Sequence, residues 1–306
     1  MTVVANIIVG GLVLGALYAI IALGYTMVYG IIELINFAHG DVFAFGAFIA
    51  IPVGNRLVNQ NSFTVPVATS IIAIGVLIIF AALACAILGV VIERVAYRPL
   101  RNAPRLAPLI TAIGVSLILE NALSQIFGGQ SIYFPVLLTT SNYSFLGTSI
   151  SNVQIIVVVV AVAMMLALDL FVNRTRLGKA MRAVAQDREA ASMMGINVDF
   201  IISLTFFIGS ALAGAGAIIY GMDIQSIGYS SGFTLGLFAF TAAVLGGIGN
   251  IRGAMLGGLA IGLIQTWVDQ LNGGTAWYDV ATFVVLVLVL VFRPAGFLGT
   301  NTPEKV

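Results

Sequence analysis

The sequence predicts an all-α protein, a single transmembrane domain over residues 1–306 built as a polytopic bundle of about eight or nine membrane-spanning helices. First, 60% of the 306 residues are hydrophobic and only 8% are charged, whereas soluble globular domains carry roughly a quarter charged residues. Second, uncharged runs such as 2–32, 57–92 and 121–168 exceed the roughly 20 residues with which a helix crosses the hydrocarbon core of a bilayer. Third, these runs do not alternate apolar and polar residues as barrel strands do, and backbone groups in lipid must be hydrogen-bonded internally, so only helices fit.

The apolar runs place the spans in order along the chain. We expect spans over residues 5–30, 37–53, 65–92, 106–128, 153–172, 200–222, 233–250, 253–271 and 276–292. Residues 31–53 carry Glu33, Asn36, His39 and Asp41 ahead of a short apolar run, which predicts either a full crossing or a broken helix. The glycine-rich segment 246–258 predicts either two crossings or one bent pair. Small residues that recur every four positions there predict close helix packing.

The positive charges predict the orientation of the chain, because Lys and Arg gather on the cytoplasmic side. If the loop 93–105 is cytoplasmic, the alternation of the spans leaves only Arg56 outside among the 13 Lys and Arg residues. This places the N-terminus outside and the C-terminus in the cytoplasm. We expect the protein to lie in the plasma (inner) membrane. No Lys or Arg precedes Arg56, so we expect the first span to remain in the mature protein rather than to be a cleaved signal peptide.

Two of the spans contain a similar short sequence, which we call the echo. Residues 43–47 read FAFGA and residues 238–242 read FAFTA, and the two spans are predicted to run in opposite directions. An inverted-topology repeat has this arrangement, with the paired spans at the centre of the subunit. Chance similarity is the alternative, because Ala and Phe are common in this chain.

The loop 173–199, which we name the coupling loop, concentrates charge in an otherwise apolar chain and divides into two short helices. Gly178–Gln186 places Met181, Val184 and Ala185 on one face. Asp187 suits an N-cap for a second helix, with Glu189 in its first turn and Gly195 as its end. The second helix has an apolar stripe of Ala190, Met193 and Met194. Two interpretations stand: interfacial helices whose Arg residues meet lipid headgroups, or a helix that docks in the groove of a partner protein.

A resemblance favours docking. The run 189–195, EAASMMG, resembles the EAA---G pattern of ABC-importer permeases, whose cytoplasmic coupling helix docks in a groove of the ATPase. Residues 15–48, 177–197 and 240–265, with RPLR at 98–101, are similar to LivH-type permeases of branched-chain amino acid ABC importers. The resemblance implies a non-enzymatic subunit that moves Leu, Ile and Val inward by alternating access. It also implies its partners: a second, LivM-like permease subunit, two cytoplasmic ATPases and an extracytoplasmic binding protein.

The site residues follow from this resemblance and from the polar groups within the spans. We expect coupling to the ATPase through Arg182, Gln186, Asp187, Glu189, Ala190, Ala191, Met194 and Gly195. Intramembrane ionisable residues are functional candidates by default. The candidates for the translocation pathway are Asn36, His39, Asp41, Phe45, Glu120 and Phe240. We expect the side chains of Asn36 and Asp41 to satisfy backbone groups freed by a helix break.

Other functions leave different signatures. Gly178-Lys179 is followed by Ala180 and lacks the upstream glycine of a phosphate-binding GxxxxGK[ST] loop, so energy must come from another polypeptide or from an ion gradient. An ion-coupled secondary transporter, or a permease for urea or short amides of the same family, remain the alternatives. One histidine and one cysteine leave too few ligands for a metal site, and we expect neither a cofactor nor a nucleic-acid partner.

Overall fold

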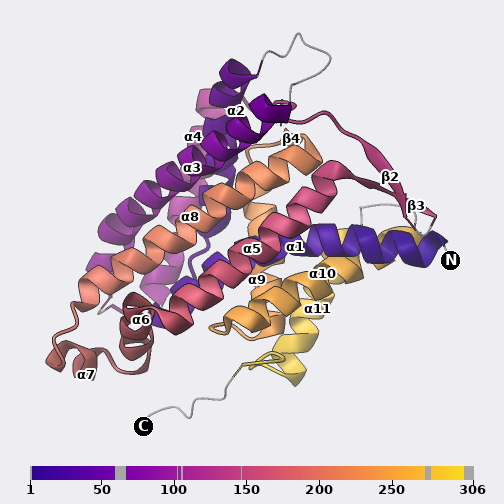
Figure 1. The fold of residues 1–306 in the computed structure, drawn as a ribbon. Helices are drawn as coiled ribbons and strands as arrows, with labels where there is room; N and C mark the ends of the chain where they lie inside the picture. Colours follow the sequence, from indigo (N-terminus) through magenta and orange to yellow (C-terminus); the bar gives the residue numbers. More distant parts are fainter. Residues whose placement is uncertain are drawn as a thin grey trace.

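The computed structural model describes residues 2–58, 67–101, 103–104, 106–145, 147–272 and 277–299. Figure 1 shows an elongated bundle of helices, with the N-terminus and strands β2 and β3 toward one end and helices α6 and α7 at the other. Within the described residues, six helices are long and apolar enough to cross a membrane. They are α1 (Thr2–Ile32), α3 (Val67–Ile92), α4 (Leu106–Phe127), α5 (Asn152–Arg174), α8 (Val198–Ile224) and α10 (Ile251–Asn272). The predicted all-α polytopic bundle is confirmed.

Shorter elements complete the described chain. Helices α2 (His39–Leu57), α9 (Ser231–Gly246) and α11 (Tyr278–Phe292) lie among the long ones, so the count of eight or nine crossings stays a prediction. Helix α3 continues through a π-helical turn, η1 (Glu93–Tyr97), and a 3-10 turn, η2 (Arg98–Leu100). Two small antiparallel sheets pair β1 (Ile132–Tyr133) with β4 (Ser226–Ile227), and β2 (Asn142–Phe145) with β3 (Thr148–Ser151).

Helix α1 forms the core of the bundle. Its residues 15–28 are all buried, whereas α3 exposes Ile71 and Ile72, each 65% accessible. A helix that is apolar all round and buried all round must be covered by other helices on every side, while α3 has a face left for lipid or another protein. The core of the molecule therefore lies along the second half of α1.

Small residues bring the central helices into close contact. A Cβ added at Gly258 of α10 would lie 2.6 Å from Cα of Ala19 in α1, and one at Gly89 of α3 would lie 3.0 Å from the carbonyl oxygen of Phe206 in α8. Helix backbones approach this closely only where side chains are small, and such packing is the main attraction between helices in lipid. The pairs α1–α10 and α3–α8 are thus held by backbone proximity.

The structure shows where the helices begin and end at the two ambiguous joints. Helix α1 ends at Ile32, residues 33–38 are not helical, and α2 begins at His39, so the chain is broken between these two helices, and a full crossing by α2 stays a prediction. Helix α9 ends at Gly246 and α10 begins at Ile251, so the glycine-rich segment is a tight turn between two packed helices.

Candidate functional site

The break between α1 and α2 is held by side chains of other elements. Glu33 follows the last residue of α1 and has a left-handed backbone conformation, with φ +56°. Its N–H still donates to the Tyr29 carbonyl at 2.8 Å. The buried Asn36 accepts a hydrogen bond at its Oδ1 from the hydroxyl of Tyr97, which lies in η1, at 3.0 Å. Ser116 of α4 donates to Oδ2 of Asp41.

The expectation that Asn36 and Asp41 satisfy freed backbone groups with their side chains is therefore wrong. Other groups bond the backbone at the break instead. The N–H of His39 donates to the carbonyl of Asn36 at 3.0 Å, that of Val42 donates to the carbonyl of Ala38 at 3.0 Å, and the Tyr97 hydroxyl donates to the carbonyl of Ile35 at 3.4 Å. The side chains of Asn36 and Asp41 tie the break to η1 and α4.

The N-terminal ends of α2 and α9 meet in the interior. A Cβ added at Gly40 would overlap the carbonyl oxygen of Gly232, and one at Gly236 would lie 3.1 Å from Cα of Gly40. Oδ1 of Asp41 points toward this crossing, 2.8 Å from where a Cβ at Gly232 would lie. That oxygen has no hydrogen-bond partner among the described residues, although Asp41 is fully buried. Unsatisfied buried polar groups are uncommon and mark a place with a further role.

His39 lies against α1 beside this crossing. A Cβ added at Gly24 would overlap its imidazole, and the ring stands edge-on to Tyr25 with 4.9 Å between centroids. The imidazole lies beside the backbone of Ile21, but neither ring nitrogen makes a hydrogen bond of normal geometry to a described residue. The ring is positioned by shape, because glycine at position 24 leaves the space that it fills.

The remaining pathway candidates lie at different distances from the crossing. Phe240 of α9 packs against Tyr25 and Phe37, at centroid distances of 6.2 and 5.5 Å. Phe45 is half-buried one turn further along α2, and the half-buried Glu120 lies one turn beyond Ser116 on α4. The structure thus groups His39, Asp41 and Phe240, while Phe45 lies one turn further along α2 and Glu120 lies on α4, near enough to Asp41 to interact with it electrostatically.

Sequence reasoning missed three residues that organise this region: Tyr25, Tyr97 and Ser116. Tyr25 and Ser116 lie inside long apolar runs and resemble ordinary core residues, whereas Tyr97 lies among the charged residues of 93–101 and resembles part of a loop. Their hydroxyl groups are the feature that could have identified them, because a buried hydroxyl usually has a hydrogen-bond partner.

The coupling loop folds as two helices, α6 (Arg176–Gln186) and α7 (Arg188–Met193). Met181 and Val184 are buried on one face of α6, as predicted. Oδ1 of Asp187 accepts from the N–H groups of Glu189 and Ala190 at 2.9 and 3.0 Å, which confirms the N-cap.

The end of α7 follows the prediction as well. Gly195 has φ +81°, a value that glycine adopts without strain, and its N–H donates to the Ser192 carbonyl at 3.0 Å. The N–H of Ile196 reaches back to the Ala191 carbonyl at 3.0 Å. The chain therefore leaves α7 in a sharp turn toward α8.

The apolar side of α7 faces away from the bundle. Met193 and Met194 are 82% and 83% exposed, and Glu189 and Ala190 are exposed beside them. Ala191 is buried and fixes the helix to the body of the protein. An exposed pair of large apolar side chains on a capped helix indicates a surface that either another protein or the membrane covers.

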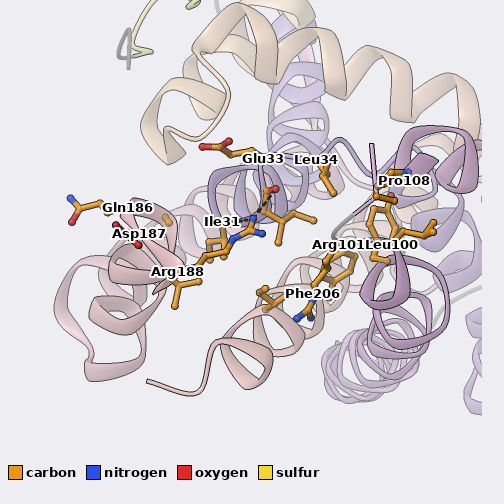
Figure 2. A pocket seen from close by; sticks show the side chains of 16 residues that line it. Ile31, Glu33, Leu34, Leu100, Arg101, Pro108, Gln186, Asp187, Arg188 and Phe206 are labelled. Carbon is orange, nitrogen blue, oxygen red and sulfur yellow. Dashed lines mark hydrogen bonds between the residues drawn. The ribbon is translucent and has the colours of Figure 1, made fainter. Parts of the chain in front are cut away.

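Two arginines attach the coupling loop to the membrane helices. Arg182 donates to the carbonyl of Val172 and, at 3.1 Å, to Oδ1 of Asn173, which ties α6 to the end of α5. Nη2 of Arg188 donates to the carbonyls of Ile31 and Ile32 at 3.3 and 3.0 Å, as Figure 2 shows. Because these carbonyls end α1, Arg188 links the coupling loop directly to the helix break.

An ionic network joins η1 and η2 to the start of α8. Arg101 pairs with both Glu93 and Asp199, and Arg98 also pairs with Asp199. The hydroxyl of Ser203 donates to Glu93 at 2.7 Å, so the fully buried carboxylate of Glu93 has a charged and a neutral partner. Removing one partner of such a buried pair would leave an uncompensated charge, which is strongly destabilising.

Comparison with known proteins covers nearly the whole chain. Residues 7–290 match the family described as branched-chain amino acid transport system / permease component. The chain is similar to the high-affinity branched-chain amino acid transport system permease protein BraD of Pseudomonas aeruginosa, with 45% identity over 98% of this chain and 97% of that protein. It is similar to the permease protein LivH of the same kind of system in Escherichia coli, with 41% identity over 97% of this chain and 96% of that protein. No solved structure matches the chain.

Proposed function

This chain belongs to the permease component family of branched-chain amino acid transport systems, and from that premise we propose that it is the translocation subunit of an ATP-driven ABC importer for Leu, Ile and Val. It is a multi-pass membrane permease. The observation that carries the proposal is the full-length similarity to BraD and LivH, because it includes the break, the coupling loop and the glycine-rich turn together. Separate ATPase subunits hydrolyse ATP, and an extracytoplasmic binding protein delivers the amino acid.

The coupling loop receives the force of the ATPases in this proposal. Ala190, Met193 and Met194 enter the groove of an ATPase subunit, and Gln186 and Glu189 fix the register with charge and hydrogen bonds. Asp187 and Gly195 shape α7 by capping its ends, and Ala191 and Arg182 anchor the loop to the bundle. The exposure of both methionines beside a buried Ala191 supports this division of roles.

Arg188 then carries the movement inward. It bonds the last carbonyls of α1, and the break that follows leads to His39 and Asp41 at the crossing of α2 and α9. A displacement of α7 therefore changes the position of the break. The interior polar groups at the crossing, with Phe240 beside them, form the part of the pathway that opens alternately to each side.

The packing of the central helices supports the inverted repeat that the echo suggests. Helices α1, α2 and α3 correspond in order to α8, α9 and α10 in this proposal. If α1 corresponds to α8 and α10 to α3, the pair α1–α10 corresponds to the pair α8–α3. Both of these pairs are tightly packed, as a repeat requires. The two echo segments lie on α2 and α9, which cross each other at the centre. In many transporters a central site lies at the interface of two such repeats.

The orientation that the positive charges favour completes the proposal. The coupling loop and the network at Arg98 and Arg101 face the cytoplasm, and the two small sheets face the binding protein outside. The exposed apolar faces of the outer helices meet lipid and a second permease subunit.

The proposal is tested by reconstitution. The chain is co-expressed with a second permease subunit and two ATPases and placed in liposomes, with the binding protein added outside. Uptake of labelled leucine should require both ATP and the binding protein. Uptake by the permease alone under an ion gradient would instead indicate a secondary transporter, and ATP-driven uptake of urea or an amide without leucine would indicate another substrate class.

A further inference from the structure

A cavity of about 300 Å³ lies where the coupling loop meets the membrane helices. Its walls come from the end of α1, from η2 and the start of α4, from the α6–α7 junction and from α8 (Figure 2). None of the pathway candidates lines it. A cavity of this volume is at the lower end of those that hold small molecules, so it fits a ligand about as large as a free amino acid.

Four charged residues line this cavity, namely Glu33, Arg101, Asp187 and Arg188, and Glu33 and Arg188 do not pair with each other. The carboxylate of Glu33 is exposed and makes no hydrogen bond or ion pair to another described residue. Arg188 bonds α1 through Nη2 alone, so its Nε and Nη1 have no acceptor within the described ranges. By contrast, Arg98, Arg101 and Arg252 all pair with carboxylates.

A ligand that carries both charges suits this arrangement. A carboxylate bonds a guanidinium through two parallel hydrogen bonds, and an ammonium group bonds a carboxylate. Glu33 takes the left-handed conformation that commonly ends a helix, so its place at the cavity is fixed by the end of α1.

The opposite side of the cavity is mainly apolar. Figure 2 shows Leu100, Pro108 and Phe206 across from Glu33 and Arg188, and Leu34 lies beside them. Arg101 also lines this side, but its guanidinium is engaged with Glu93 and Asp199. The cavity therefore presents unpaired charges on one side and an apolar wall on the other, which is the pattern of a zwitterion with a branched aliphatic side chain.

We infer that this cavity binds a free amino acid with an apolar side chain from the cytoplasm, and that the bound amino acid slows the transport cycle. The inference rests on the proposed function, because it makes the imported molecule the regulator. The ligand would contact both α1 and the α6–α7 junction and so favour the arrangement in which they lie together. A ligand that binds one state of a cycle better than the others raises the population of that state and slows turnover.

Direct binding tests the inference without transport. The purified complex of permeases and ATPases, without the binding protein, is titrated with labelled leucine. Ala103→Phe adds a bulky side chain to the cavity lining, and Glu33→Gln removes the charge that would pair with the ammonium group while keeping the side-chain shape. Ala107→Phe, in the first turn of α4 but outside the cavity lining, is the matched control.

We expect saturable binding by the wild type and by Ala107→Phe, its loss in Ala103→Phe, and at least a tenfold weaker affinity in Glu33→Gln. Absence of saturable binding by the wild type would overturn the inference. Binding that is unchanged in both cavity variants would also overturn it, because the leucine would then occupy another site.

The regulatory effect is measured as the rate of ATP hydrolysis in liposomes that are empty or preloaded with leucine, with leucine-loaded binding protein outside. Loading should slow hydrolysis several-fold in the wild type and leave Ala103→Phe unchanged, with equal rates in empty liposomes. Equal rates in loaded and empty wild-type liposomes that do take up leucine overturn the regulatory inference alone. No ATP-dependent uptake into empty liposomes contradicts the proposed function instead, and the binding measurement still decides whether the cavity holds leucine.

Discussion

Replacing Gly24 with alanine tests whether His39 is positioned by shape. The added methyl group would overlap the imidazole, well inside the roughly 3.5–4.0 Å at which carbon atoms pack, and it would lie 3.1 Å from the Gly209 carbonyl oxygen. His39 is 1% exposed and stands against Tyr25, so its ring has little space into which to move. Overpacking of this kind costs about 1–3 kcal/mol. Alanine otherwise favours a helix over glycine by about 1 kcal/mol, which offsets part of that cost.

Gly114→Ala in α4 is the matched control, because no atom lies within 4 Å of the added methyl group. We expect this control to be neutral or slightly stabilised, and Gly24→Ala to unfold at a temperature several degrees lower and to lose most leucine uptake. The double variant Gly24→Ala, His39→Ala should recover stability relative to the sum of the single variants, because the methyl group then occupies vacated space. Thermal unfolding of the purified complex is measured for the wild type, Gly24→Ala, His39→Ala, the double variant and Gly114→Ala. Equal stability of Gly24→Ala and Gly114→Ala would refute the reasoning.

Three further predictions concern the coupling loop and the break. Replacing both Met193 and Met194 with serine should leave folding unchanged, since both are over 80% exposed. The same change should reduce leucine-dependent ATP hydrolysis at least tenfold. Unchanged hydrolysis would exclude the two methionines from the ATPase contact. Gly195→Val should destabilise the end of α7 by about 1–2 kcal/mol because φ is +81°, whereas Gly195→Asn should be tolerated, and hydrogen exchange at Ile196 reports the difference. Ser116→Ala should cost about 1–3 kcal/mol in unfolding free energy by leaving Oδ2 of Asp41 without its donor, and a smaller loss would mean that water replaces the hydroxyl.

Local chemistry could be predicted from the sequence, and contacts between distant segments could not. The cap at Asp187, the stop at Gly195 and the buried face of α6 depend on residues within four positions of each other, so short patterns identify them. The break after Ile32 was one of two alternatives for the same reason, since polar residues there interrupt an apolar run.

The bonds that hold the break have no such local signal. Tyr97 reaches Asn36 across 61 positions, and Arg188 reaches Ile32 across 156. The long helices are apolar on nearly every side, so periodicity does not reveal which face meets which neighbour. This is why Asn36 and Asp41 were assigned to nearby backbone groups when their partners lie on η1 and α4.

The hydrogen bonds from Arg188 to the end of α1 are too weak to drive a full conformational change by themselves. A hydrogen bond from a charged group contributes about 1.5–3 kcal/mol, so freeing Arg188 from the end of α1 changes an equilibrium by roughly 10- to 150-fold. Moving a two-state protein from 1:99 to 99:1 requires about 5.5 kcal/mol. Alternating access therefore needs a second contact that differs between its states.

The network of Arg98, Arg101, Glu93 and Asp199 suits this role, because it lies at the same end of the bundle and joins α8 to the turn that holds Asn36. We accordingly expect the coupling loop and this network to rearrange together. A double-mutant cycle between Arg188→Lys and Asp199→Asn tests this, with leucine-dependent ATP hydrolysis as the measured rate. It should give a coupling free energy of at least about 0.5 kcal/mol. Strict additivity of the two changes would mean that the two links act independently.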